Sequence, residues 1–178
     1  MSHFEKELSR ELKFKGKIVD LWHDQVELEN GKAALREVIR HPGAVAVLVR
    51  DRDALILVRQ YRYAAQMEML EVCAGKLEPH EAPAPAAARE LEEETGFGCG
   101  PLIPLGDYYG SPGILSEVIH LYYTEPAGRQ AAHPDADEFV STVRVSLKEF
   151  EAMIARGEIN DGKTLAAYTL ARARGLLE

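Results

Sequence analysis

The chain has 178 residues, a length that suits one well-buried domain rather than two. Its formal net charge of −8 at pH 7 argues against a nucleic-acid polymer as the main partner. No apolar run approaches the length of a membrane span and no signal peptide is visible, so we expect a cytoplasmic protein with no membrane partner. Cys73 and Cys99 have no metal-ligand spacing and are expected to be buried free thiols.

The first predicted elements are strands between residues of about 11 and 40. KIVDLWHDQVEL and AALREVIRH flank Asn30-Gly31, a hairpin signal because both residues tolerate positive φ. This β-segment, residues 1–41, cannot bury both of its faces alone. We therefore expect it to pack on the rest of the chain or on a second copy, and residues 42–178 to form the main domain.

Apolar runs in the rest of the chain predict a sheet and its covering helices. AVAVLVR, ALILVRQYRY and MLEVCAGKL are expected to form three strands, and LIPLGDYY, EVIHLYYTE and FVSTVRVS three more. LKEFEAMIARGE and TLAAYTLARARGLL have the spacing of amphipathic helices. The pattern predicts a mixed β-sheet between helices, an α/β fold with α+β character.

A further helix is predicted from about residue 85 to 95, where prolines are tolerated in the first turn and Gly96 is placed to end it. Its sequence RELEEE puts Glu90, Glu93 and Glu94 on one face. Three neighbouring carboxylates repel one another, and a hard divalent cation such as Mg²⁺ or Mn²⁺ removes that repulsion. The alternative is an ordinary solvated acidic helix.

That alternative leaves a fixed pattern unexplained. Gly75, five residues, Glu81, seven residues and the run RELEEETGF at 89–97 match every fixed position of the Nudix box. The chain therefore resembles the Nudix hydrolases of nucleoside diphosphates linked to another moiety. RHPGAVAVLV, VRQYRYA, AGKLEP and a Ser-Pro-Gly loop at 111–113 further resemble ADP-ribose pyrophosphatases and related nucleoside-diphosphate-sugar hydrolases.

The resemblance implies metal-dependent hydrolysis of the pyrophosphate bond of ADP-ribose or a related nucleotide sugar, which gives two monophosphates. Mg²⁺ is the expected cofactor, with Mn²⁺ as the alternative. The implied metal ligands are three box glutamates and one backbone carbonyl: Ala74, Glu90, Glu93 and Glu94. Arg89 is expected to hold Glu81 or Glu93 in place.

A general base is also needed near the attacking water. In similar enzymes it comes from the loop before the last strand, where Glu138 is the matching position. Asp135 and Asp137 compete for this role, and any of the three is alternatively a solvated loop charge.

Arginines are the first candidates for binding the substrate, because a guanidinium binds phosphate through two parallel hydrogen bonds. Arg36 and Arg62 match positions that contact substrate in relatives, whereas Arg59 is as easily a surface charge. Where relatives stack an aromatic ring on the base, this chain has Val19, and Trp22 either substitutes for that ring or only packs.

The Ser-Pro-Gly loop supplies further candidates. Pro112 and Gly113 are expected to shape a loop over the nucleotide, and Glu117 either contacts substrate or is a charge at the start of a strand. The resemblance also implies a homodimer that exchanges the N-terminal β-segment. Hydrolysis of GDP-mannose or another nucleotide sugar is the alternative within the family, and a silent, nucleotide-sensing Nudix domain is the alternative outside catalysis.

Overall fold

The computed structural model describes residues 3–133 and 139–178. Within these ranges no helix is both long enough and apolar enough to cross a membrane. Both cysteines are free thiols, as expected. Cys73 is buried, but Cys99 is only half-buried, so its predicted burial was wrong.

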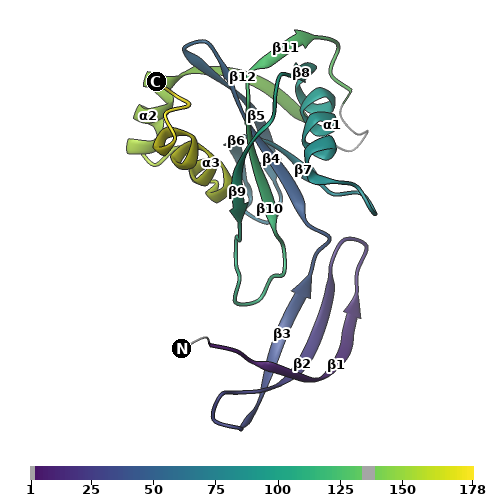
Figure 1. Cartoon of the computed structure of the whole chain (residues 1–178). Coiled ribbons are helices and arrows are strands. Elements are labelled where there is room, and N and C mark those ends of the chain that lie inside the picture. Colours follow the sequence, from purple (N-terminus) through teal and green to yellow (C-terminus); the bar gives the residue numbers. More distant parts are fainter. Residues whose placement is uncertain (1–2, 134–138) are drawn as a thin grey trace. The chain divides into compact units, whose positions relative to one another are not determined.

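Contacts gather the chain into two compact parts (Figure 1). The N-terminal part combines Met1–Gly43 with Tyr109–Val118, and the main part combines Ala44–Tyr108 with Ile119–Glu178. The division into residues 1–41 and 42–178 stays a prediction. The sequence did not predict that residues 109–118 would pack with the N-terminal strands.

The N-terminal part is a three-stranded antiparallel sheet of β1 (Lys6–Lys15), β2 (Asp20–Glu27) and β3 (Ala33–Arg40). The Asn30-Gly31 turn joins β2 to β3, with Gly31 at φ 76°. The first half of β1, residues 6–10, was not predicted, because Leu8 is its one apolar residue and a single position shows no alternation.

The main part contains a mixed sheet whose central order is β12-β5-β4-β10-β9, with β6 paired to β5 and β7 paired to β4. Its strands are β4 (Ala44–Asp51), β5 (Ala54–Arg62), β6 (Met67–Glu71), β7 (Cys73–Lys76), β9 (Ile103–Tyr108), β10 (Ile119–Thr124) and β12 (Val140–Ser146). The β4–β10 pair is parallel and the other pairs are antiparallel. The predicted mixed sheet is confirmed.

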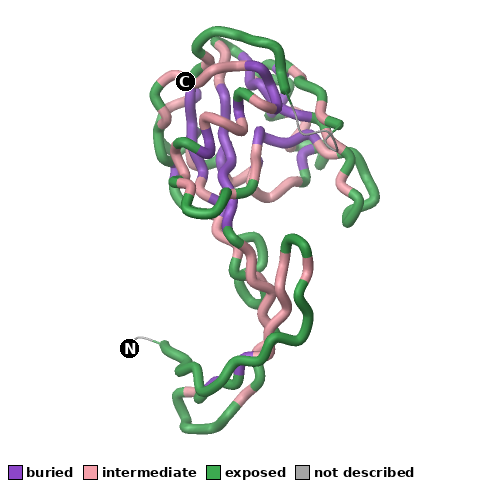
Figure 2. Tube along the Cα trace, turned by 90° about the vertical axis from the view of Figure 1, so that its right-hand side faces the viewer, coloured by how far each residue is buried: buried purple, intermediate pink, exposed green. Residues whose placement is uncertain are grey.

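Helices cover both faces of this sheet. Helix α1 (Pro83–Thr95) packs on one face, and α2 (Leu147–Ala155) and α3 (Gly162–Ala173) pack on the other (Figure 1). Strands β4 and β5 are buried on both faces, which explains their continuous apolar runs. Figure 2 shows that buried residues gather in the main part, while the N-terminal part is mostly half-buried or exposed.

Two details of the main part escaped prediction. The run MLEVCAGKL forms two strands, because the chain changes partner at Val72 from β5 to β4. A small two-stranded sheet of β8 (Phe97–Cys99) and β11 (Pro126–Arg129) is too short to leave a periodic pattern.

The core under α1 gives a direct test of this packing. Leu91 is fully buried against the sheet, so Leu91→Ala is expected to lower the free energy of unfolding by about 3 kcal/mol. Urea denaturation measures the loss. Glu92→Ala, on the exposed side of the same helix, is the matched control and should change stability by less than about 0.5 kcal/mol. Equal effects of the two substitutions would contradict the packing of α1.

Candidate active site

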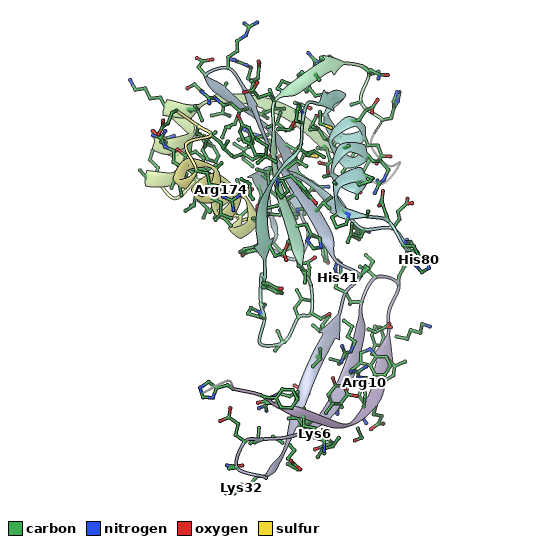
Figure 3. All side chains as sticks on the ribbon, in the orientation of Figure 1. Lys6, Arg10, Lys32, His41, His80 and Arg174 are labelled. Carbon is green, nitrogen blue, oxygen red and sulfur yellow. The ribbon has the colours of Figure 1, made fainter. Side chains whose placement is uncertain are left out.

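Helix α1, strand β7 and the loop between them carry the residues of the box. The helix begins after Ala82, with proline in its first turn, and ends at Gly96, which has φ 72° and donates its N–H to the carbonyl of Glu92. Strand β7 pairs with β4, with Gly75 opposite Val45. The loop that joins β7 to α1 passes through His80, labelled in Figure 3.

Arg89 binds three carboxylates at once. Its Nε and Nη2 donate to the two oxygens of Glu81 at 2.9 Å each, and its Nη1 donates to Glu90 at 2.9 Å and to Glu93 at 2.8 Å. Arg89, Glu81 and Glu90 are largely buried, whereas the side chain of Glu93 is 42% exposed. One guanidinium therefore fixes a loop carboxylate and two helix carboxylates relative to one another.

The charges in this cluster stabilise each other. Hydrogen bonds from Arg89 lower the pKa of the Glu81 carboxyl, helped by the backbone N–H of Glu78. The bond to Glu81, with further contributions from Glu90 and Glu93, raises the pKa of Arg89. Glu81 and Arg89 are consequently ionised at neutral pH.

Two more residues are brought close to the cluster. Glu94 is 5% exposed and its Oε2 accepts from the backbone N–H of Ala74 at 3.2 Å. A Cβ on Gly75 would lie 1.9 Å from Cδ of Glu90, so only glycine leaves room for that carboxylate against β7. The glycine of the box is therefore explained by the close approach of a glutamate.

These donors fit a hard divalent cation, since they are carboxylate oxygens beside one backbone carbonyl. The Glu90 carboxylate lies against the strand that carries Ala74, where the predicted ligands from helix and strand would meet. In the part of the chain that the structure describes, no three His, Cys, Asp or Glu side chains are gathered as a metal site. Glu90 and Glu93 each accept a hydrogen bond from Arg89. The four predicted metal ligands stay a prediction.

Arg62, at the end of β5, forms a bidentate pair with Glu71 of β6. Its Nε and Nη2 each donate to a carboxylate oxygen at 2.7 Å, and Lys163 of α3 binds the same carboxylate. Neither Glu71 nor Lys163 was predicted from the sequence to belong to the site. A signal for Glu71 existed, because it is a charge inside the apolar run MLEVC, but its partner Lys163 lies 92 residues away.

The Glu71 carboxyl gives a pH prediction. Burial would raise its pKa, but bonds from Arg62 and the charge of Lys163 outweigh burial, so the pKa is lowered from 4.5. A lowered folded pKa adds stability that is present above the unfolded pKa and is lost as the pH falls through the folded value. We expect the stability advantage of the wild type over Glu71→Gln to shrink below pH 4.5. Denaturant titrations of both proteins from pH 7 to 3 measure it, and a constant difference would contradict the assignment.

Two predicted substrate residues lie in strands of the N-terminal part. Arg36 of β3 donates to both carboxylate oxygens of Glu5, one bond measuring 3.0 Å and the other 2.5 Å. Trp22 of β2 has the Arg10 guanidinium over its ring at 5.8 Å (Figure 3 labels Arg10). Its indole N–H is buried without a hydrogen-bond partner among the described residues.

The remaining candidates of the N-terminal part lie between β9 and β10. Pro112 and Gly113 are exposed, and Gly113 has open space around its Cα. Glu117 lies 3.2 Å from Nδ1 of His41, which follows β3. The segment is attached to β3 by backbone bonds of Ile39, so its conformation is set by that strand.

Glu138, Asp135 and Asp137 lie outside the described residues. His133, the last described residue before them, donates its N–H to the carbonyl of Glu93 at 2.8 Å. His133 is therefore held beside the last turn of α1.

Comparison with known proteins settles the family. The model of the NUDIX domain matches residues 39–168, most of the chain. The chain belongs to the Nudix family. The box predicted from the sequence is thus confirmed as a family signature, and Arg89 with its carboxylates is the Nudix box arranged in space.

Relatives of this Nudix protein include several named enzymes. It is 39% identical over 177 residues to the ADP-ribose pyrophosphatase of Bacillus subtilis (strain 168), covering 98% of this chain and 96% of that protein. It is 42% identical over 166 residues to the methanol dehydrogenase activator of Bacillus methanolicus, covering 92% and 90%. Identity to the GDP-mannose pyrophosphatase of Citrobacter koseri is 32% over 159 residues, covering 79% and 83%.

A solved structure supports the fold. The crystal structure of an ADP compounds hydrolase superposes with a TM-score of 0.84 at 23% identity, covering 97% of this chain and 95% of the other. The Nudix fold expected from the sequence is confirmed.

Proposed function

We propose that this Nudix protein hydrolyses the pyrophosphate bond of ADP-ribose or a closely related nucleoside diphosphate sugar and releases two monophosphates. The arrangement of the box carries the proposal: one half-buried arginine orients Glu81, Glu90 and Glu93 beside β7. Identity to an ADP-ribose pyrophosphatase along nearly the whole chain supports the same substrate class. Phosphoryl transfer needs mainly positioning and charge neutralisation, which such a rigid cluster can provide.

Members of this family generally depend on a divalent metal ion. For this chain we propose Mg²⁺, with Mn²⁺ as the alternative, held by the Ala74 carbonyl and by Glu90, Glu93 and Glu94. When bound, the metal would polarise the phosphates and lower the pKa of a bound water. The role of Arg89 is to keep two of these carboxylates and Glu81 in one arrangement.

Glu138 is the proposed general base, and Asp135 and Asp137 remain its competitors. The bond from the His133 N–H to the Glu93 carbonyl supports this proposal, because His133 is five residues before Glu138 in the sequence. A base must lie within hydrogen-bond reach of the attacking water, which the box glutamates are proposed to hold through metal.

Arg62 is the proposed phosphate contact in the main part, since its side chain is 40% exposed and carries a fixed positive charge. Arg36, Trp22, Pro112, Gly113 and Glu117 are proposed to bind the rest of the substrate from the N-terminal part. The bond of Arg36 to Glu5 means that a phosphate must compete with a carboxylate for that guanidinium.

The N-terminal sheet also supports the proposed homodimer. Its strands and the residues next to them expose large apolar side chains to solvent: Phe4, Leu8, Leu12, Phe14, Ile18 and Leu35. Large apolar side chains exposed in this number are typical of an interaction surface. Light scattering should give twice the mass of the 19.8 kDa chain, and a monomer at micromolar concentration would exclude the exchange of this segment. A cytoplasmic location stays a prediction.

One panel tests the substrate. Purified protein with Mg²⁺ is assayed for monophosphate release from ADP-ribose, GDP-mannose, NADH and a nucleoside triphosphate. ADP-ribose is expected to have the highest kcat/KM. GDP-mannose is the second candidate, because relatives that carry this activity are 31–33% identical to the chain. Absence of turnover on every diphosphate with either metal would favour a silent, nucleotide-sensing domain.

A further inference from the structure

The most buried charge of the main part lies outside the box. The side chain of Glu71 is 1% exposed, and it receives a bidentate pair from Arg62 on β5 and a third bond from Lys163 on α3. Burying an ion pair costs several kcal/mol in lost hydration, and apolar residues of similar size are often as stable. Stability alone is therefore a poor explanation for a buried carboxylate with two cations.

A second layer fixes Lys163. Its Nζ also bonds to Asp161 at 3.0 Å, and Asp161 caps α3 by accepting from the N–H and hydroxyl of Thr164. The Thr164 hydroxyl in turn accepts from the N–H of Val72 at 2.9 Å, next to Glu71 in the chain. The N-terminus of α3 is thus bonded to the point where β6 passes into β7.

The side chain of Arg62 stays 40% exposed although it is paired with Glu71. Its bidentate bond uses Nε and Nη2, and among the described residues no hydrogen bond is made by Nη1. The guanidinium is also close enough to Glu94 of the box for that carboxylate to contribute to its raised pKa, after the larger effect of Glu71. An arginine with one edge clamped and one edge exposed beside the box is suited to bind a phosphate.

We propose that Glu71, clamped by Lys163, is a positioning residue that holds the guanidinium of Arg62 ready for a substrate phosphate. The inference rests on the proposed pyrophosphatase function and adds to it a second group of residues, supplied by β6 and α3. A free arginine side chain loses rotamer entropy when it is fixed. Glu71 imposes that loss during folding, so binding of the phosphate does not incur it.

Steady-state kinetics with the best nucleotide sugar test this role. Glu71→Gln keeps the shape of the side chain but replaces one acceptor oxygen by a donor, and it should raise KM about tenfold with kcat within about threefold. Lys163→Gln, which leaves the bidentate pair intact, should raise KM about threefold. Asp51→Asn is the matched control. It breaks the 2.9 Å pair with Arg144 beside the start of β5, at the end opposite to Arg62, and should leave both constants unchanged.

A double-mutant cycle separates positioning from general stability. Arg62→Lys cannot form the bidentate pair, so adding Glu71→Gln to it should raise KM by no more than about twofold, whereas independent effects would multiply. Wild-type KM values in both Glu71→Gln and Lys163→Gln, or multiplied effects in the double variant, would overturn the inference. If Glu71→Gln fails to fold, the KM of Lys163→Gln is the deciding measurement. A wild type that releases monophosphate from no nucleotide sugar would instead defeat the proposed function, and the inference with it.

Discussion

Glu93→Gln is expected to reduce turnover by about 1,000-fold or more, because it removes a charged oxygen from the proposed ligands of the metal ion that would neutralise the phosphates. The fold should hardly change. Glu93 is 42% exposed and makes one bond to Arg89, and such half-exposed pairs contribute less than about 1 kcal/mol. Monophosphate release at saturating Mg²⁺ and thermal unfolding by circular dichroism measure the two effects.

Glu92→Gln is the matched control for that experiment. It makes the same chemical change one residue earlier, on the exposed side of α1, and should retain wild-type activity. If Glu93→Gln kept activity within tenfold of the wild type, Glu93 would have to be removed from the proposed metal ligands.

Gly75→Ala is expected to lower activity by about 100-fold while the protein stays folded. The new Cβ would lie 1.9 Å from Cδ of Glu90 and 2.1 Å from both of its oxygens, so the carboxylate must leave its place against β7. The displaced atoms are the end of a flexible side chain, which can move at small energetic cost. The concentration of Mg²⁺ for half-maximal activity should rise about 10- to 100-fold.

Gly100→Ala controls for the loss of a glycine. Its added Cβ would meet a backbone oxygen of Glu125 at 3.1 Å and no glutamate carboxylate, so activity should stay near that of the wild type. A fully active Gly75→Ala variant would mean that the position of Glu90 against β7 does not matter for turnover.

Elements marked by long apolar runs were predictable from the sequence. Strands β4 and β5 follow from such runs. Helix α1 follows from the helical spacing of its residues and from the proline and glycine at its ends. Strand β1 was predicted only in its second half, because residues 6–10 contain one apolar residue, Leu8, and so show no alternation. The break at Val72 depends on which strand lies beside each half of an apolar run, and local sequence does not contain that information.

The site divides in the same way. Spacing along one helix brought Glu90, Glu93 and Glu94 to one face, and the structure adds that Glu94 is buried against the N–H of Ala74. Glu71 and Lys163 meet only because α3 packs where β6 ends, 92 residues further along the chain. Contacts of that range are set by tertiary packing and have no local signature.

The bonds between residues 109–118 and β3 determine which segments must be exchanged together in a chimera of two related proteins. Ile39 donates to the carbonyl of Ile114 at 2.7 Å and accepts from the N–H of Ser116 at 2.9 Å, and His41 donates its N–H to the Ser116 hydroxyl at 3.1 Å. A chimera that takes residues 1–43 from another parent would cut across these bonds. It should take residues 109–118 from that parent too, so that the two stretches are inherited together.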